Sequence, residues 1–143
     1  MLRPTLAAAV LALSACSNSA LDYADAGTTA LAISQGATEL NPVVGIAGDA
    51  AAPVVALVVK AGVREYMAQN GYSECEIDRT VNSGSVFGLT NNLVWLAGGP
   101  TPIGLAVGGI AAIAYYEAQD CVTLYYDVII DPATGDVEVV FDD

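Results

Sequence analysis

Four apolar segments follow one another along this chain, and residues that interrupt regular structure separate them. They span residues 24–40, 51–70, 80–97 and 103–118, and the breaks fall at Asn41-Pro42, Asn70-Gly71 and Gly98-Gly99-Pro100. Apolar stretches of this length, bounded by Asn, Gly and Pro, are typical of helices. The sequence therefore predicts a mainly α fold, with about four short apolar helices over residues 24–120.

The pattern changes after Asp120. Residues 121–130 and 137–141 are rich in β-prone residues, and a stretch containing Pro132 and Gly135 separates them. Such runs around a turn predict a β-hairpin. From Glu117 onward the chain has eight acids and no base, so we expect residues 121–143 to form an acidic β-hairpin. Because a two-stranded hairpin is marginal alone, it should dock on the helices or on a partner.

Composition narrows the range of functions. The chain has 143 residues, of which 55% are hydrophobic and 14% charged, and its net charge is −12. This argues against nucleic-acid binding, since contacts with phosphate need Lys and Arg. The absence of His removes Ser–His and Cys–His nucleophiles and the commonest zinc ligand. The sequence contains no phosphate loop or metal-ligand cluster, so we expect no cofactor, no metal and no enzymatic activity.

The first 16 residues combine Arg3, an apolar run over residues 6–13 and the tetrapeptide Leu13-Ser14-Ala15-Cys16. This tetrapeptide resembles the lipobox of bacterial lipoproteins. The resemblance implies that residues 1–15 are a cleaved signal peptide and that Cys16 becomes the acylated N-terminus, followed by a tether over residues 16–23. It places the protein in the bacterial cell envelope, facing the periplasm or the exterior. The alternative is an ordinary signal peptide or an uncleaved anchor, with Cys16 incidental.

Two arrangements at a membrane fit the apolar helices. Each segment is shorter or more polar than a typical span of about 20 residues. However, Thr101 is the only conventional polar residue over residues 93–116. The helices form either a small bundle within the membrane or a bundle on its surface. We favour the membrane-embedded arrangement, although four crossings would place Lys60, Arg64 and Arg79 against the positive-inside bias.

A polar stripe follows the first apolar segment. At 100° per residue, helical positions separated by three, four, seven and eleven residues lie near one line. Asp25, Thr29, Ala32, Gly36 and Glu39 have this spacing. A carboxylate among apolar helices needs a partner or a proton. Lys60, between Val59 and Ala61, is the candidate partner of Asp25 or Glu39, unless it extends to a lipid headgroup.

The same residues carry a family resemblance. Over residues 22–64, the pattern resembles a family of small uncharacterised multi-helix membrane proteins of bacteria. It comprises Asp25-x3-Thr29, Gly36-x2-Glu39-x-Asn41-Pro42 and Lys60 in the next helix. The resemblance implies a buried polar network of these residues and no particular activity. This chain differs from the family in its lipobox leader, its short helices and its acidic tail.

Small residues recur at four-residue spacing in the last two apolar segments. Gly84 and Gly88 share one helix face, as do Gly104 and Gly108. Such stripes let two helices approach closely, so we expect these two helices to pack on each other. A pore or oligomer lined by glycine is the less favoured alternative.

Two cysteines remain besides Cys16. Cys75 precedes the third apolar segment and Cys121 follows the fourth. In an antiparallel helical hairpin both lie at the same end, and a domain outside the cytoplasm permits disulfides. We therefore predict a Cys75–Cys121 bond, with two free buried thiols as the alternative.

These observations favour a non-enzymatic cell-envelope lipoprotein that acts as a structural or interaction module. Its expected partners are membrane lipid and either a second copy of the chain or an envelope protein. A second hypothesis is a small membrane transporter or channel subunit with Asp25, Glu39 and Lys60 along an ion path. A hydrolase ranks last, because the spacing indicates no pair of base and nucleophile.

Overall fold

The structure is a computed structural model that describes residues 18–121 and two further segments, 126–130 and 137–141. Cys16, the leader and the turn at residues 131–136 lie outside the described residues. The described chain is mainly helical, as the sequence predicts. Its helices are α2 (Ala20–Ser34), α3 (Pro42–Gly45), α4 (Ala52–Gln69), α5 (Glu74–Leu96) and α6 (Thr101–Ala118), with a 3-10 turn, η1, at Asp49–Ala51.

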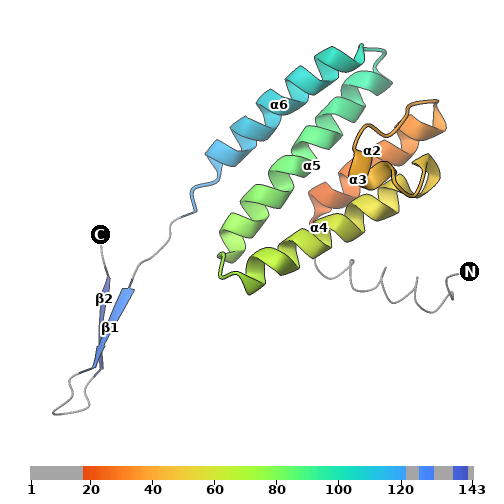
Figure 1. Ribbon diagram of the computed structural model, residues 1–143. Helices are drawn as coiled ribbons and strands as arrows, with labels where there is room; N and C mark the ends of the chain where they lie inside the picture. The colour runs from red at the N-terminus through yellow and green to blue at the C-terminus, as the bar shows by residue number, and fades with distance from the viewer. Residues whose placement is uncertain (1–17, 122–125, 131–136, 142–143) are drawn as a thin grey trace, which may run out of the picture.

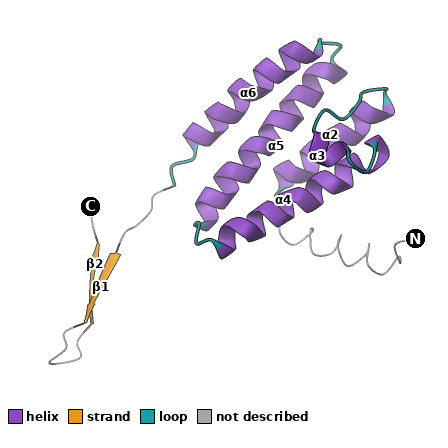
Figure 2. Cartoon of the chain, in the orientation of Figure 1, coloured by secondary structure: helices purple, strands orange, loops and turns teal. Residues whose placement is uncertain are grey.

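Helix α5 is the centre of the bundle and packs against α2, α4 and α6. Figure 1 shows α6 along one side of α5, and α2 and α4 along the other. The short helix α3 and η1 lie in the connection between α2 and α4 (Figure 2). In this arrangement polar side chains of α2, α4 and α5 contact one another. These contacts form the candidate site.

Two capping boxes extend the helices beyond their predicted starts. The Ser19 hydroxyl accepts from the Asp22 N–H, and the Asp22 carboxylate accepts from the Ser19 N–H; Ser73 and Glu76 repeat the arrangement. A capping box satisfies two backbone donors that a helix leaves unpaired at its start. Consequently α2 begins at Ala20, within the predicted tether, and α5 begins at Glu74, before the apolar segment predicted over residues 80–97.

The end of α2 also differs from the prediction. The helix stops at Ser34, and Gly36 follows with a φ of 98°. The N–H groups of Gly36 and Ala37 donate to the carbonyls of Ile33 and Ala32, both at 3.0 Å. This is the Schellman arrangement, in which the left-handed residue is usually glycine. Because the helix ends here, Gly36 and Glu39 do not extend the helical stripe that begins with Asp25.

The buried apolar core of the described residues is small. It consists of Ala26, Ala32, Val44, Ala52, Ile77 and Val81. The buried polar side chains are almost as numerous, namely Asp22, Asp25, Arg64, Asn82 and Ser85. Since buried charges need partners, the interior of this bundle depends on its polar contacts as well as on apolar packing.

Within residues 18–121 and the two C-terminal segments, no helix has both the length and the apolar character that crossing a bilayer requires. The preference for membrane-embedded helices is therefore not supported by the described helices.

Two five-residue strands follow the helices. Strand β1 (Tyr126–Ile130) pairs antiparallel with β2 (Val137–Phe141), with Tyr126 opposite Phe141 and Ile130 opposite Val137. Residues 122–125, which join β1 to the helices, lie outside the described residues, as does the turn between the strands. The acidic β-hairpin predicted over residues 121–143, and its docking on the helices or on a partner, therefore stay predictions.

Candidate functional site

A pocket of about 990 Å³ opens between α2, α4, α5 and the segment that carries α3. Its polar lining includes Asp25 and Thr29 on α2, Lys60 on α4, Asn91 and Asn92 on α5, and Glu39 in the loop after α2. Its apolar lining includes Ile33, Val44, Val59, Val63, Phe87 and Trp95. Apolar walls with a few convergent polar groups are typical of small-molecule sites.

Lys60 and Asp25 form an ion pair in the pocket wall. Lys60 Nζ lies 2.6 Å from Oδ2 of Asp25 and 3.7 Å from Oδ1 of Asp22. The two side chains of the close pair are 15% and 11% exposed. Lys60 thus turns into the protein, so the structure favours its pairing with Asp25 over extension to a lipid headgroup.

A second, more deeply buried set of contacts continues behind this pair. Arg64 Nη2 lies 3.1 Å from Oδ2 of Asp22 and donates to Oδ1 of Asn82 at 2.7 Å. The Ser85 hydroxyl donates to Oδ1 of Asp22, and Arg64 Nη1 also pairs with Asp78. Asp22 and Ser85 are fully buried. The carboxylate of Asp22 therefore caps α2 and also binds groups from α4 and α5.

The pKa values of the two aspartates shift in opposite directions. Burial alone would raise the pKa of Asp22. The Ser85 and Ser19 hydrogen bonds, together with the charges of Lys60 and Arg64, nevertheless hold that pKa below its ordinary value. For Asp25, burial raises the pKa, and the charges of Glu39 and Asp22 add to the rise, while Lys60 opposes it. Two carboxylates one helical turn apart thus differ in how readily they take up a proton.

Helix α5 supports Asp25 in two ways. The Asn92 amide donates to Thr29 Oγ1 at 2.8 Å and lies 3.4 Å from Asp25 Oδ1. Gly88 leaves the space that the carboxylate occupies, because a Cβ atom there would stand 2.8 Å from Asp25 Cγ. The position of Asp25 therefore depends on the amide at residue 92 and on the missing side chain at residue 88.

The structure brings part of the predicted polar network together. Asp25, Thr29 and Lys60 lie together in the pocket wall, whereas Glu39 and Asn41 lie in the loop after α2. Asn41 caps α3 by accepting from the Val43 and Val44 N–H groups, and Glu39 Oε1 accepts from the Asn41 N–H at 2.6 Å. Among the described residues no cation pairs with Glu39, so Asp25 is the partner of Lys60.

Sequence reasoning missed several members of the network, namely Asp22, Arg64, Asn82, Ser85 and Asn92. The sequence does contain a spacing that indicates Asp22 and Arg64. Asp22 precedes Asp25 by three residues and Arg64 follows Lys60 by four, so each pair shares one helix face. Asp22 was missed because it lies in the predicted tether. Asn82, Ser85 and Asn92 of α5 have no comparable signal, since Ser and Asn are mostly exposed in folded proteins.

The glycine stripes are used differently from the prediction. Gly104 and Gly108 of α6 do face α5, because a Cβ atom on either would meet the Asn91 or Phe87 carbonyl oxygen at 3.2 or 2.8 Å. On α5, however, Gly88 faces Asp25 of α2, and a Cβ atom on Gly84 would meet no described atom within 4 Å. The close approach between α5 and α6 therefore rests on glycines of α6 alone.

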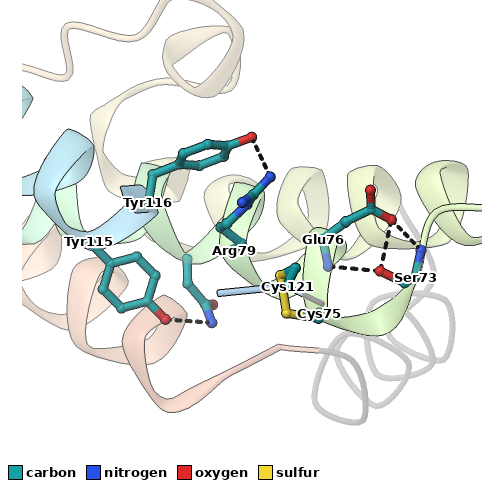
Figure 3. The surroundings of a disulfide bond; sticks show 8 residues. Ser73, Cys75, Glu76, Arg79, Tyr115, Tyr116 and Cys121 are labelled. Carbon is teal, nitrogen blue, oxygen red and sulfur yellow. Dashed lines mark hydrogen bonds between the residues drawn. A yellow bond between two sulfur atoms is a disulfide. The ribbon is translucent and has the colours of Figure 1, made fainter. Parts of the chain in front are cut away.

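The structure joins Cys75 in the first turn of α5 to Cys121 after α6, with 5.6 Å between the Cα atoms. Figure 3 shows this disulfide beside Arg79, Tyr115 and Tyr116. Arg79 Nη2 donates to the Tyr116 hydroxyl at 2.9 Å, and its guanidinium carbon lies 4.1 Å from the Tyr116 ring centre. The disulfide and the Arg79–Tyr116 contact thus tie the same ends of α5 and α6 together.

The pocket contains groups suited to ligand binding and to proton exchange. Within the described part of the chain, no group of three His, Cys, Asp or Glu side chains is placed to hold a metal ion. What the site offers is an apolar pocket, a carboxyl group with a raised pKa, and an ammonium group held beside it.

Comparison with known proteins adds no relative: neither a protein-family model, nor a curated protein, nor a solved structure matches this chain.

Proposed function

We propose that this chain is a bacterial cell-envelope lipoprotein, anchored through Cys16, whose helical domain acts as a non-catalytic interaction module. The observation that carries the proposal is the disulfide between Cys75 and Cys121. Disulfides persist in oxidising compartments and are rare in the cytosol. An exported, lipid-anchored domain would meet that condition, and the leader ending in Leu13-Ser14-Ala15-Cys16 would supply the export and the anchor.

The contacts of Asn18 support a position close to the membrane surface. Its side-chain amide donates to the Leu57 carbonyl of α4 at 3.1 Å. Cys16 is two residues away along the chain, which gives a reach of about 7 Å. An acyl group on Cys16 would therefore hold α4 near the bilayer. Val54 and Val58, on the same helix, are 45% and 36% exposed, so α4 offers apolar side chains that could contact the headgroup region.

The acidic C-terminal segment is the proposed contact for a partner. Eight acids and no base follow from Glu117 onward, and β1 and β2 lie within this stretch. Complementary charge favours encounter with a basic surface, so the partner would be an envelope protein with exposed Lys and Arg. The helical bundle would then link the lipid anchor at one end of the chain to the partner contact at the other.

Metabolic labelling with a fatty acid tests the anchor. The wild-type chain should incorporate label, and Cys16→Ser should lose it. The matched control is the double variant Cys75→Ser/Cys121→Ser, which removes the other two cysteines but keeps Cys16 and should keep the label. Label that persists in Cys16→Ser, or that is absent from the wild type, would overturn the proposal.

A further inference from the structure

The pocket beside Lys60 and Asp25 is a site that the lipoprotein proposal does not use. We propose that it binds an organic cation: a molecule with an apolar body of moderate size and one amine or quaternary ammonium group. The argument rests on the size of the pocket, the charges in its lining and its aromatic residues. It does not depend on lipidation of Cys16.

The size and walls of the pocket suit an apolar body. Its volume of about 990 Å³ lies at the upper end of the range for small-molecule pockets, about 300–1,000 Å³. All three principal helices that form it contribute apolar side chains, including Ile33 of α2, Val59 and Val63 of α4, and Phe87 of α5. Removing apolar ligand surface from water against such walls provides the main driving force for binding.

The charges in the lining select against an anion. The ionisable lining residues are Asp25, Glu39 and Lys60, which together carry one net negative charge when all are ionised. Lys60 is already neutralised by Asp25 at 2.6 Å and approached by Asp22 at 3.7 Å. An anionic ligand would therefore compete with two carboxylates for Lys60, and it would also meet the charge of Glu39.

Glu39 is the group that would receive a cation. It is half-buried, and its Oε1 accepts from the Asn41 N–H at 2.6 Å. No cationic side chain lies within ion-pair distance of it among the described residues. A ligand ammonium group would supply this missing partner. Phe87 and Trp95 also line the pocket, and aromatic faces attract cations, quaternary ammonium groups above all.

Trp95 makes the proposal directly measurable. It is the only tryptophan of the chain and it lines the pocket, so its fluorescence reports on occupancy of this one site. The experiment titrates the purified full-length protein with decyltrimethylammonium and, separately, with decanoate, which has an alkyl chain of similar length and the opposite charge. Both are used below the concentration at which they form micelles. We expect a saturable change with the ammonium compound and binding of decanoate weaker by on the order of tenfold or more.

Two pairs of variants assign the binding to this pocket. Glu39→Gln should weaken the ammonium compound about fivefold, the effect of losing one partly exposed ion pair, whereas Glu65→Gln on the exposed surface of α4 should not. Gly84→Leu should block the pocket, because Gly84 lines it and a Cβ atom there meets no described atom within 4 Å. Gly62→Leu, equally free of described contacts and outside the lining, is the control.

Four results would contradict the proposed cation site. Equal affinity for decanoate and the ammonium compound would overturn the selection for a cation, as would unchanged binding by Glu39→Gln. A titration that does not saturate, or that is the same in Gly84→Leu and Gly62→Leu, would show that the compound associates with the acidic surface and not with the pocket.

Discussion

The carboxylate of Asp25 occupies the space that a side chain at Gly88 would fill. A Cβ atom on Gly88 would stand 2.8 Å from Asp25 Cγ and 2.9 Å from its Oδ2. The ion pair between α2 and α4 is therefore built against the backbone of α5. A substitution on a helix that carries neither partner of the ion pair should disturb it.

Gly88→Ala tests this relationship, with Gly84→Ala as its control. Ala at residue 88 must push the carboxylate away from its position, and overpacking of this kind costs about 1–3 kcal/mol of unfolding free energy. Ala at residue 84 meets no described atom within 4 Å and should stabilise α5 by up to about 1 kcal/mol through helix propensity. Urea denaturation of both variants measures the difference. Equal stabilities would mean that α2 and α5 do not approach each other as described.

Lys60→Met should destabilise the protein by leaving Asp25 without its cation. We expect a loss of about 3 kcal/mol, at the lower end of the range for buried pairs because both side chains keep some exposure. Adding Asp25→Asn to Lys60→Met should recover much of this loss, since the stranded charge is then gone. Denaturant unfolding of the single and double variants forms the cycle that measures the coupling.

The double variant Lys60→Met/Glu39→Gln is the control for that cycle. Glu39 forms no ion pair with Lys60 in the structure, so its neutralisation should add no recovery. Recovery with Glu39→Gln and not with Asp25→Asn would show that Lys60 pairs with Glu39, which contradicts the Lys60–Asp25 ion pair.

Asp22 should make stability fall in acid. Its folded pKa is lowered from 3.8, so its contribution is fully present above about that pH and is lost as the pH falls through the folded pKa. The difference in unfolding free energy between the wild type and Asp22→Asn should therefore be constant near neutral pH and shrink below pH 3.8. Urea unfolding followed at a series of pH values measures it.

Asp25 should change the pH dependence of stability in the opposite direction. Its folded pKa is raised above 3.8, so the folded protein takes up the proton before the unfolded chain does. As the pH falls through the folded pKa towards 3.8, the wild type should gain stability relative to Asp25→Asn. The same direction for both aspartates would contradict the difference in their surroundings.

Removal of the disulfide should lower stability without changing the helical content. Cys75 and Cys121 close a loop with a sequence separation of 46 residues, and loop-closure entropy of that size corresponds to about 4 kcal/mol. Unfolding of Cys75→Ala/Cys121→Ala, compared with the wild type, measures this loss. Alkylation of the denatured, unreduced protein should label neither cysteine, and labelling of both would refute the bond.

The periodicity of apolar residues was sufficient to predict the features that depend on apolar segments and on position along the chain. The antiparallel arrangement of α5 and α6 follows from two apolar segments joined by a short Gly- and Pro-rich break. That arrangement alone brings Cys75 and Cys121 to the same end. Lys60 stands out among apolar neighbours, and its pairing with an acid of the first helix follows from the cost of burying a charge.

The remaining features depend on contacts between segments that carry no local signal. The choice of Asp25 over Glu39 is decided by the end of α2, since Gly36 turns the chain and removes Glu39 from the helix. A glycine within an apolar segment fits a packing contact as well as a helix end, so periodicity does not distinguish them. The role of Asp22 likewise depends on Arg64 and Ser85, which reach it only after the helices have packed.

The double use of Asp22 has a mechanical consequence. The Ser19 N–H and hydroxyl contact the Asp22 carboxylate at 2.8 and 3.1 Å, and the same hydroxyl donates to Asn82 of α5 at 2.6 Å. A force that pulls the chain at the N-terminal side of α2 would load these contacts and the Asn18–Leu57 hydrogen bond before α2 unwinds. These contacts connect the start of α2 to both α4 and α5, so tension at that end would act on three helices and not on α2 alone.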